Sequence, residues 1–114
     1  MRKIVSALLA AACVALLTSP AAQAAPNKVT KGEFQRVGHA WKMTRVHHVF
    51  DTAGKVIFAY EGSGQFCDLD DLWACPSETR EYKAKSPYSY VTVDFIRYPN
   101  GVWRLDTKEA HFWN

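Results

Sequence analysis

The chain has 114 residues, a formal net charge of +3 and three cysteines. This length provides one domain with a modest core, which excludes the large dinucleotide-binding and barrel enzyme folds. The small net charge excludes a general electrostatic footprint for nucleic acid or for an anionic membrane.

The first 24 residues have the pattern of a secretory signal. Basic Arg2-Lys3 precedes an apolar run over residues 4–17, and residues 22–24 have the small-residue pattern of a signal-peptidase cleavage site. We therefore expect cleavage near Ala24 and secretion of the remaining chain into the extracellular space.

Removal of residues 1–24 leaves residues 25–114 as one secreted α+β domain. The signal holds two basic residues and no acid, so the net charge falls from +3 to +1, while all fifteen aromatic residues remain. Acylation of Cys13 is a competing interpretation of the signal, although apolar residues 14–17 continue behind this cysteine. No later stretch approaches the roughly 20 apolar residues of a membrane span, so we expect none.

Cys67 and Cys75 are expected to form a disulfide, because an exported chain reaches an oxidising compartment. On the chain-entropy argument, closing so short a loop stabilises the fold by roughly 2–3 kcal/mol. A zinc site needs three or four ligands, and no histidine neighbours either cysteine. We therefore expect no metal and no cofactor.

Two short helices are predicted first. Thr30 and Glu33 have the spacing of a capping box, which favours a helix from there through Val37, with Gly38 as its stop.

A second helix is predicted to start at Thr44. Val46, Val49 and Phe50 then form the apolar stripe of a helix that packs on a core, and Gly54 ends it.

The remaining chain predicts an antiparallel meander. Residues 56–60 favour a strand but are soon broken by glycines, so residues 61–79 are interpreted as an irregular loop around the disulfide. We expect full strands over residues 80–86, 88–98 and 102–113, with a hairpin turn at Pro99-Asn100-Gly101.

Alternation along residues 88–98 assigns two faces to that strand. Val91, Val93 and Phe95 are expected to be buried, because two short helices can cover only one side of a sheet. The predicted fold is therefore α+β: two short N-terminal helices on one face of a three- to four-stranded antiparallel sheet, with one disulfide. A one-residue slip at the hairpin would exchange the faces of residues 102–113.

The order of these signals resembles the repeat unit of the actinobacterial β-lactamase inhibitory proteins. The resemblance is carried by Trp41-Lys42-Met43-Thr44-Arg45-Val46 opening a helix, then Gly54, the two cysteines, the strand 88–98 and the closing residues 106–113. The same plan is similar to that of the small outer-membrane-assembly lipoprotein. The resemblance implies this fold, an exported actinobacterial protein and a protein partner. Lys42 replaces the usual glycine, the disulfide loop is shorter, and this chain has one repeat where those inhibitors have two in tandem.

The uncovered face of the sheet is the predicted binding face. Aromatic and arginine side chains are typical of interface hot spots, although tyrosines also simply favour strands. The Trp73 side chain either stands exposed at the tip of the disulfide loop or folds back onto a small core. The binding residues that we predict are Tyr88, Tyr90, Tyr98, Arg104, Lys108 and Trp73.

We therefore predict a secreted non-enzymatic binding module for an unidentified protein partner, with no catalytic residue and in a monomeric or weakly dimeric state. Inhibition of an extracellular or cell-wall enzyme is one form of this function. The alternatives are a cell-envelope accessory protein and a small secreted hydrolase such as a ribonuclease. The hydrolase would use His111, Glu109 and Arg104, although Arg104 falls on the other strand parity.

Overall fold

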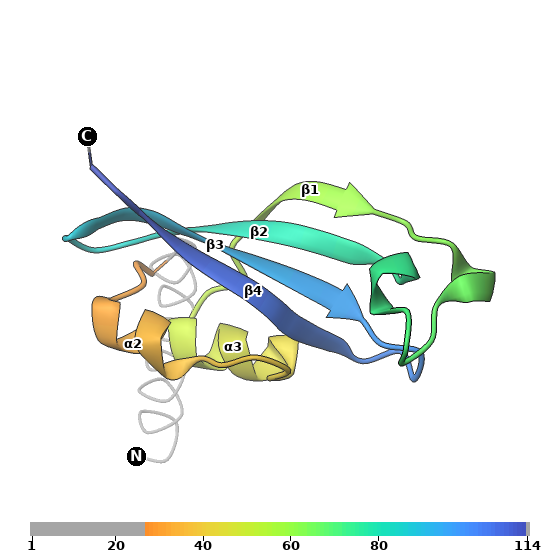
Figure 1. Ribbon diagram of the computed structural model, residues 1–114. Coiled ribbons are helices and arrows are strands. Elements are labelled where there is room, and N and C mark those ends of the chain that lie inside the picture. The colour runs from red at the N-terminus through yellow and green to blue at the C-terminus, as the bar shows by residue number, and fades with distance from the viewer. Residues whose placement is uncertain (1–26, 114) are drawn as a thin grey trace, which may run out of the picture.

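The computed structural model describes residues 27–113, so the predicted signal, its cleavage site and Cys13 lie outside the described residues. The described part has two helices, four strands and two single-turn 3₁₀ helices (Figure 1). In chain order these are α2 (Lys31–Arg36), α3 (Met43–Phe50), β1 (Lys55–Tyr60), η1 (Gly64–Phe66), η2 (Leu72–Ala74), β2 (Ser77–Lys83), β3 (Tyr88–Arg97) and β4 (Trp103–Phe112).

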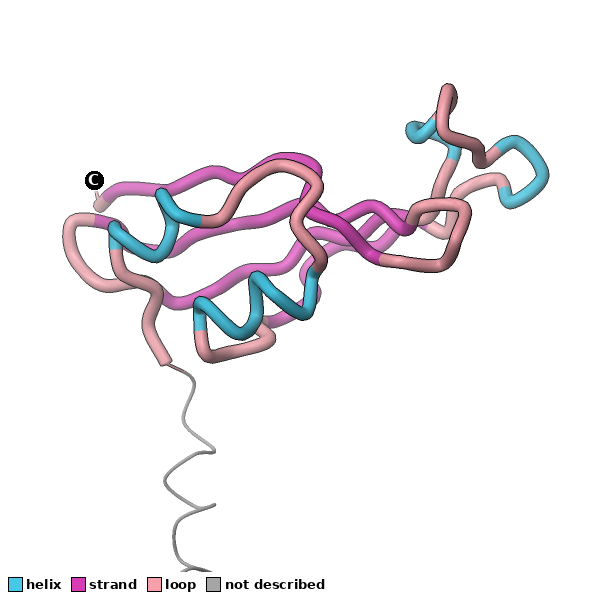
Figure 2. Tube along the Cα trace, turned by 90° about the horizontal axis from the view of Figure 1, so that it is seen from below, coloured by secondary structure: helices cyan, strands magenta, loops and turns pink. Residues whose placement is uncertain are grey.

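The four strands form one antiparallel meander in the order β1-β2-β3-β4. Both helices lie on the same side of this sheet, and they cover only one end of it (Figure 1). The other end, with β1 and the loop that holds η1 and η2, extends beyond the helices (Figure 2). The strand at this end, β1, is exposed along its whole length.

Sequence analysis predicted a smaller sheet than the structure has. Residues 55–60 form a full strand, and β2 begins at Ser77 rather than residue 80, because Phe58, Ala59 and Tyr60 pair with residues 77–79. The glycines at positions 62 and 64 follow β1 and do not interrupt it. The loop expected over residues 61–79 is accordingly shorter, and it carries the two 3₁₀ helices.

The predicted capping box is present at the start of α2. Glu33 N donates to Thr30 Oγ1 at 3.1 Å, and Thr30 N donates to Glu33 Oε1 at 2.9 Å. Two backbone N–H groups that a helix start leaves without partners are thereby satisfied. This local signal correctly located the first helix.

The second helix begins at Met43, one residue before the predicted start, and Lys42 precedes it without a side-chain cap. It ends at Phe50, before the predicted stop at Gly54, and the residue that caps it, Asp51, has a left-handed φ of 56°. Gly54 instead turns the chain into β1 with a φ of 68°, and a Cβ there would lie 2.5 Å from the Tyr82 ring. Gly54 is thus required by close packing.

The core lies between the helices and the sheet. Val46 and Phe50 of α3 are buried, as their spacing predicted, and Phe50 meets Tyr82 edge to face at 5.0 Å between ring centroids. The main buried residues opposite them are Tyr82, Val91, Val93, Phe95 and Leu105.

Candidate interaction surface

The sheet side away from α2 and α3 is here called the helix-free face, and β3 defines it. Val91, Val93 and Phe95 are completely buried towards the helices, which confirms the predicted buried row. Alternation then places the intervening residues on the other side. The helix-free face of β3 consists of Tyr90, Thr92, Asp94 and Ile96.

Tyr88 does not belong to this face, so its predicted place was wrong. In the β3–β4 ladder Tyr88 pairs with Phe112 and Tyr90 with His111, so that Ser89 is an extra residue in a β-bulge. The bulge turns Tyr88 to the helix side, where it is 5% exposed. Its ring meets the Phe34 ring of α2 edge to face at 5.4 Å.

Lys108 also lies on the helix side and not on the predicted binding face. It is the partner of buried Val93, because a second bulge in β4, at Asp106, shifts the alternation by one residue. Its Nζ donates to Phe34 O at 2.6 Å and to Val37 O at 2.8 Å. Lys108 therefore caps the last turn of α2, and burial lowers its pKa.

Arg104 and Tyr98 lie together at the hairpin end of the sheet. The Arg104 guanidinium carbon is 5.5 Å from the centroid of the Tyr98 ring. Arg104 Nη1 also donates to Ala40 O at 2.9 Å, in the connection between the helices. Part of the donor set of Arg104 is thus already committed within the chain.

Tyr90 lies at the opposite end of the helix-free face, beside His111. Their rings stack at 4.2 Å, and His111 Nε2 is 3.0 Å from Thr92 Oγ1. Glu109 Oε1 lies 3.6 Å from His111 Nδ1, which is longer than a hydrogen bond. The predicted row of three tyrosines is accordingly divided: one is buried and two lie at different ends of the sheet.

A hollow of about 310 Å³ opens on the helix-free face near the disulfide loop. Phe58 of β1 and Trp73 of η2 are its exposed walls, at 63% and 76% exposure, and Ile96 also lines it. The Trp73 ring therefore stands out from the loop and does not fold onto a core. Sequence reasoning missed Phe58, because β1 was not expected to extend the sheet.

The polar lining of this hollow includes two aspartates, Asp94 and Asp106, together with Ser77, Glu78 and Thr79. Asp94 accepts hydrogen bonds from the hydroxyl groups of Thr79 and Thr107, one from each neighbouring strand. These bonds hold the Asp94 carboxylate in one orientation. The hollow thus combines apolar walls with one oriented carboxylate, that of Asp94.

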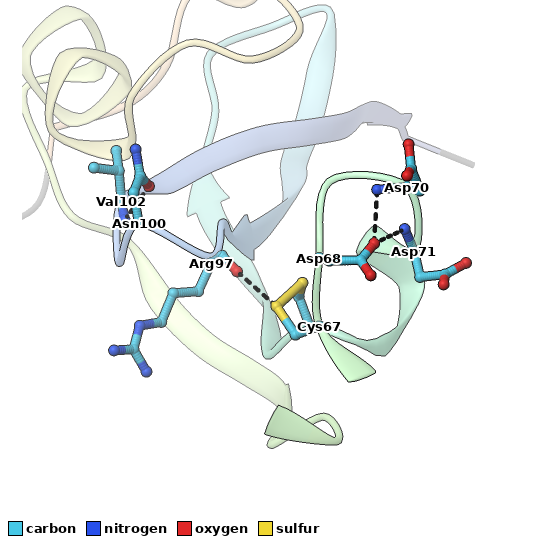
Figure 3. Close-up of a disulfide and its surroundings, with 8 residues drawn as sticks. Cys67, Asp68, Asp70, Asp71, Arg97, Asn100 and Val102 are labelled. Atoms are coloured by element: carbon cyan, nitrogen blue, oxygen red, sulfur yellow. Dashed lines mark hydrogen bonds between the residues drawn. A yellow bond between two sulfur atoms is a disulfide. The ribbon is translucent and has the colours of Figure 1, made fainter. Parts of the chain in front are cut away.

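The loop that carries Trp73 is constrained by a disulfide and by hydrogen bonds to its backbone. Cys67 and Cys75 are bonded, as predicted, with Cα atoms 4.5 Å apart (Figure 3). The Asp68 carboxylate accepts from the backbone N–H groups of Asp70 and Asp71 at 2.8 and 2.9 Å, so it stabilises the turn within the loop.

Gly62 fixes the other side of that loop. Its φ is 73°, and a Cβ at this position would lie 2.7 Å from Ala74 O, against the backbone of the loop. Only glycine combines this backbone conformation with so close an approach. The chain leaving β1 therefore packs tightly against η2.

His47 of α3 is a half-buried titratable group on the helix side of the sheet. His47 Nε2 is 3.1 Å from the Tyr82 hydroxyl, and its ring meets Phe95 edge to face. Burial, aided by nearby Arg80, lowers the pKa of His47 to about 4, and burial raises the pKa of Tyr82. His47 is therefore a neutral packing residue near pH 7.

Comparison with known proteins gave no matching protein family, no similar curated protein and no similar solved structure. Over residues 27–113 there is no helix with the length and apolarity to cross a membrane. The same residues contain no group of three or more histidine, cysteine or acidic side chains placed to hold a metal ion.

Proposed function

We propose that this chain is a non-enzymatic module that binds a protein partner on its helix-free face. The hollow beside the disulfide loop carries the proposal, because Phe58 and Trp73 expose most of their surfaces at its rim. Large apolar side chains that cluster in solvent mark interaction sites, and aromatic anchors commonly supply most of the binding energy. The disulfide and Gly62 constrain the backbone of the loop that carries Trp73, which lowers the backbone entropy lost on association.

The chemistry of the hollow favours a lysine or arginine side chain from the partner. The apolar stem of such a side chain would lie against Phe58 and Trp73, and its charged group would reach Asp94 and Asp106. Thr79 and Thr107 already orient the Asp94 carboxylate, so little reorganisation would be needed. We infer that the partner presents a basic residue on a projecting loop.

Inhibition of an extracellular or cell-wall enzyme is the narrower form of this function. Two arguments support it: the resemblance to the β-lactamase inhibitory proteins and the signal pattern, with cleavage near Ala24, that would deliver the chain outside the cell. An inhibitor needs a rigid contact surface and no catalytic group of its own.

The binding test uses the mature chain, residues 25–114, as bait in culture supernatant and in cell-wall extract of the producing organism. Trp73→Ala and Phe58→Ala are expected to weaken capture of the partner at least tenfold, a typical effect of removing an aromatic hot spot. Trp113→Ala is the matched control, because Trp113 is 72% exposed at the far end of the sheet. Equal capture by all three variants would show that the hollow is not the contact.

Inhibition is tested separately. The mature chain is titrated against a purified serine β-lactamase with a chromogenic cephalosporin, and against enzymes captured in the binding test with their own substrates. Loss of enzyme activity that Trp73→Ala relieves supports the inhibitor form. Capture of a partner without any loss of its activity would refute inhibition and leave the binding function intact.

One observation favours a hydrolase as the second candidate. His111 lies between the Thr92 hydroxyl, at 3.0 Å, and the Glu109 carboxylate, at 3.6 Å. In a catalytic triad these three side chains would act as base, nucleophile and orienting acid, respectively. Arg104 cannot join this group, because its strand partner Ile96 lies six residues from Tyr90, the partner of His111, or about 20 Å along β3. RNA and ester hydrolysis by the mature chain, abolished by His111→Ala, would support an enzyme over a binding module.

A further inference from the structure

The two edges of the sheet are protected very differently. Beside β4, the connection between the helices adds backbone pairing: Ala40 N donates to Leu105 O at 2.7 Å, and Leu105 N donates to Trp41 O at 2.8 Å. Beside β1, on the opposite edge, no backbone hydrogen bond from any described segment other than β2 is present. The outer N–H and C=O groups of β1 are therefore free to pair with another strand.

β1 has the composition of a strand that pairs further. All six of its residues are exposed, and residues 56–60 form an uninterrupted apolar run. Val56, Ile57 and Tyr60 are each more than 40% exposed in addition to Phe58. Edge strands of monomers usually carry central charges, a proline, a bulge or a very short length to prevent pairing, and of these β1 has only a bulge, at Ile57.

The charges at the two ends of β1 favour antiparallel pairing with a second copy of the same strand. Lys55 begins the strand and Glu61 follows it directly. If two copies of β1 pair antiparallel about a two-fold axis near Phe58, the Lys55 end of each copy lies beside the Glu61 end of the other. Parallel pairing would instead bring lysine beside lysine and glutamate beside glutamate.

We propose that the chain forms a two-fold symmetric dimer through antiparallel pairing of β1 with β1 of a second copy. The two sheets then form one continuous eight-stranded sheet, since each copy contributes four strands. A two-fold axis perpendicular to the sheet places both helix-free faces on the same side.

Phe58 belongs both to the hollow and to the proposed dimer contact, but the dimer is tested with the pure mature chain alone, so its outcome does not depend on the partner. Sedimentation equilibrium over concentrations from about 1 µM to 1 mM is expected to show a monomer–dimer equilibrium. Glu61→Lys places like charges at both ends of the paired strands and should weaken dimerisation about tenfold. The exchange Lys55→Glu with Glu61→Lys restores opposite charges and should restore the wild-type dissociation constant.

Two measurements keep the test separate from folding. Lys55 also faces Glu81 across the β1–β2 ladder, so thermal unfolding of every variant at low concentration reports on pairing within one chain. Hydrogen exchange should show that the β1 amides become protected as concentration rises. A chain that stays monomeric throughout, a dimer unaffected by Glu61→Lys, or a charge exchange that fails to restore dimerisation would each overturn the proposal.

Discussion

Replacing Lys108 by methionine provides the sharpest separation of a folding role from a binding role. Lys108 Nζ donates to the carbonyl oxygens of Phe34 and Val37, at 2.6 and 2.8 Å, and lies 4.6 Å from the centroid of the Phe34 ring. Methionine retains most of the apolar stem and removes the charge and all the donated bonds. The substitution therefore leaves the last carbonyl groups of α2 without this partner.

The expected loss can be estimated from these contacts. Hydrogen bonds to a charged group contribute roughly 1.5–3 kcal/mol each, but the α2 carbonyl groups are partly reached by water, which replaces some of the loss. We expect the free energy of unfolding to fall by about 2 kcal/mol. For a domain of this size, that corresponds to a fall in melting temperature of roughly 8–16 °C.

Urea and thermal unfolding followed by circular dichroism measure this change. Lys83→Met is the control, because Lys83 pairs with Tyr90 on the helix-free face and is exposed; we expect a change within about 0.5 kcal/mol. Partner capture by folded Lys108→Met should equal that of the wild type. Unchanged stability together with lost capture would refute the assignment of Lys108 to the helix side.

Three further predictions concern stability. The pKa of His47 lies near 4 when folded and near 6.5 when unfolded, so the unfolded chain binds more protons between these values and stability falls as pH drops through them. After a discount for the partial exposure of His47, we expect the free energy of unfolding, measured by urea titration, to be about 1–2 kcal/mol lower at pH 4.5 than at pH 7. His47→Gln should reduce this difference, and an equal difference in wild type and variant would contradict the prediction. Joint replacement of Cys67 and Cys75 by serine should lower the free energy of unfolding by about 2–3 kcal/mol, and an unchanged urea midpoint would argue against it. Gly62→Ala should cost about 1–2 kcal/mol, whereas Gly64→Ala, which meets no atom within 4 Å, should not; similar melting temperatures would show that the left-handed turn tolerates a side chain.

The features that the sequence predicted correctly are those set by neighbours along the chain. The capping box at Thr30 and Glu33 is a local arrangement, so its spacing alone identifies the start of α2. The alternation of Val91, Val93 and Phe95 follows from the two-residue repeat of a regular strand. Pairing of the two cysteines followed from their being the only two in the predicted mature chain.

The candidate surface depended on contacts that no local pattern reveals. Arg104 and Lys108 are four residues apart and would share a face in a regular strand, but the bulge at Asp106 separates them. The bulge at Ser89 likewise separates Tyr88 from Tyr90. Since each bulge inserts one residue and reverses the alternation beyond it, counting positions along the sequence assigns the wrong face.

The amino-acid sequence by itself determined the α+β class, the start of the first helix, the buried row of β3 and the disulfide, because each depends on periodicity, on a capping pattern or on cysteine number. Only the tertiary structure decided that β1 extends the sheet and that Phe58 and Trp73 line one hollow. Those features arise from strand register between segments distant in sequence, and register is set by the packing of whole elements against one another.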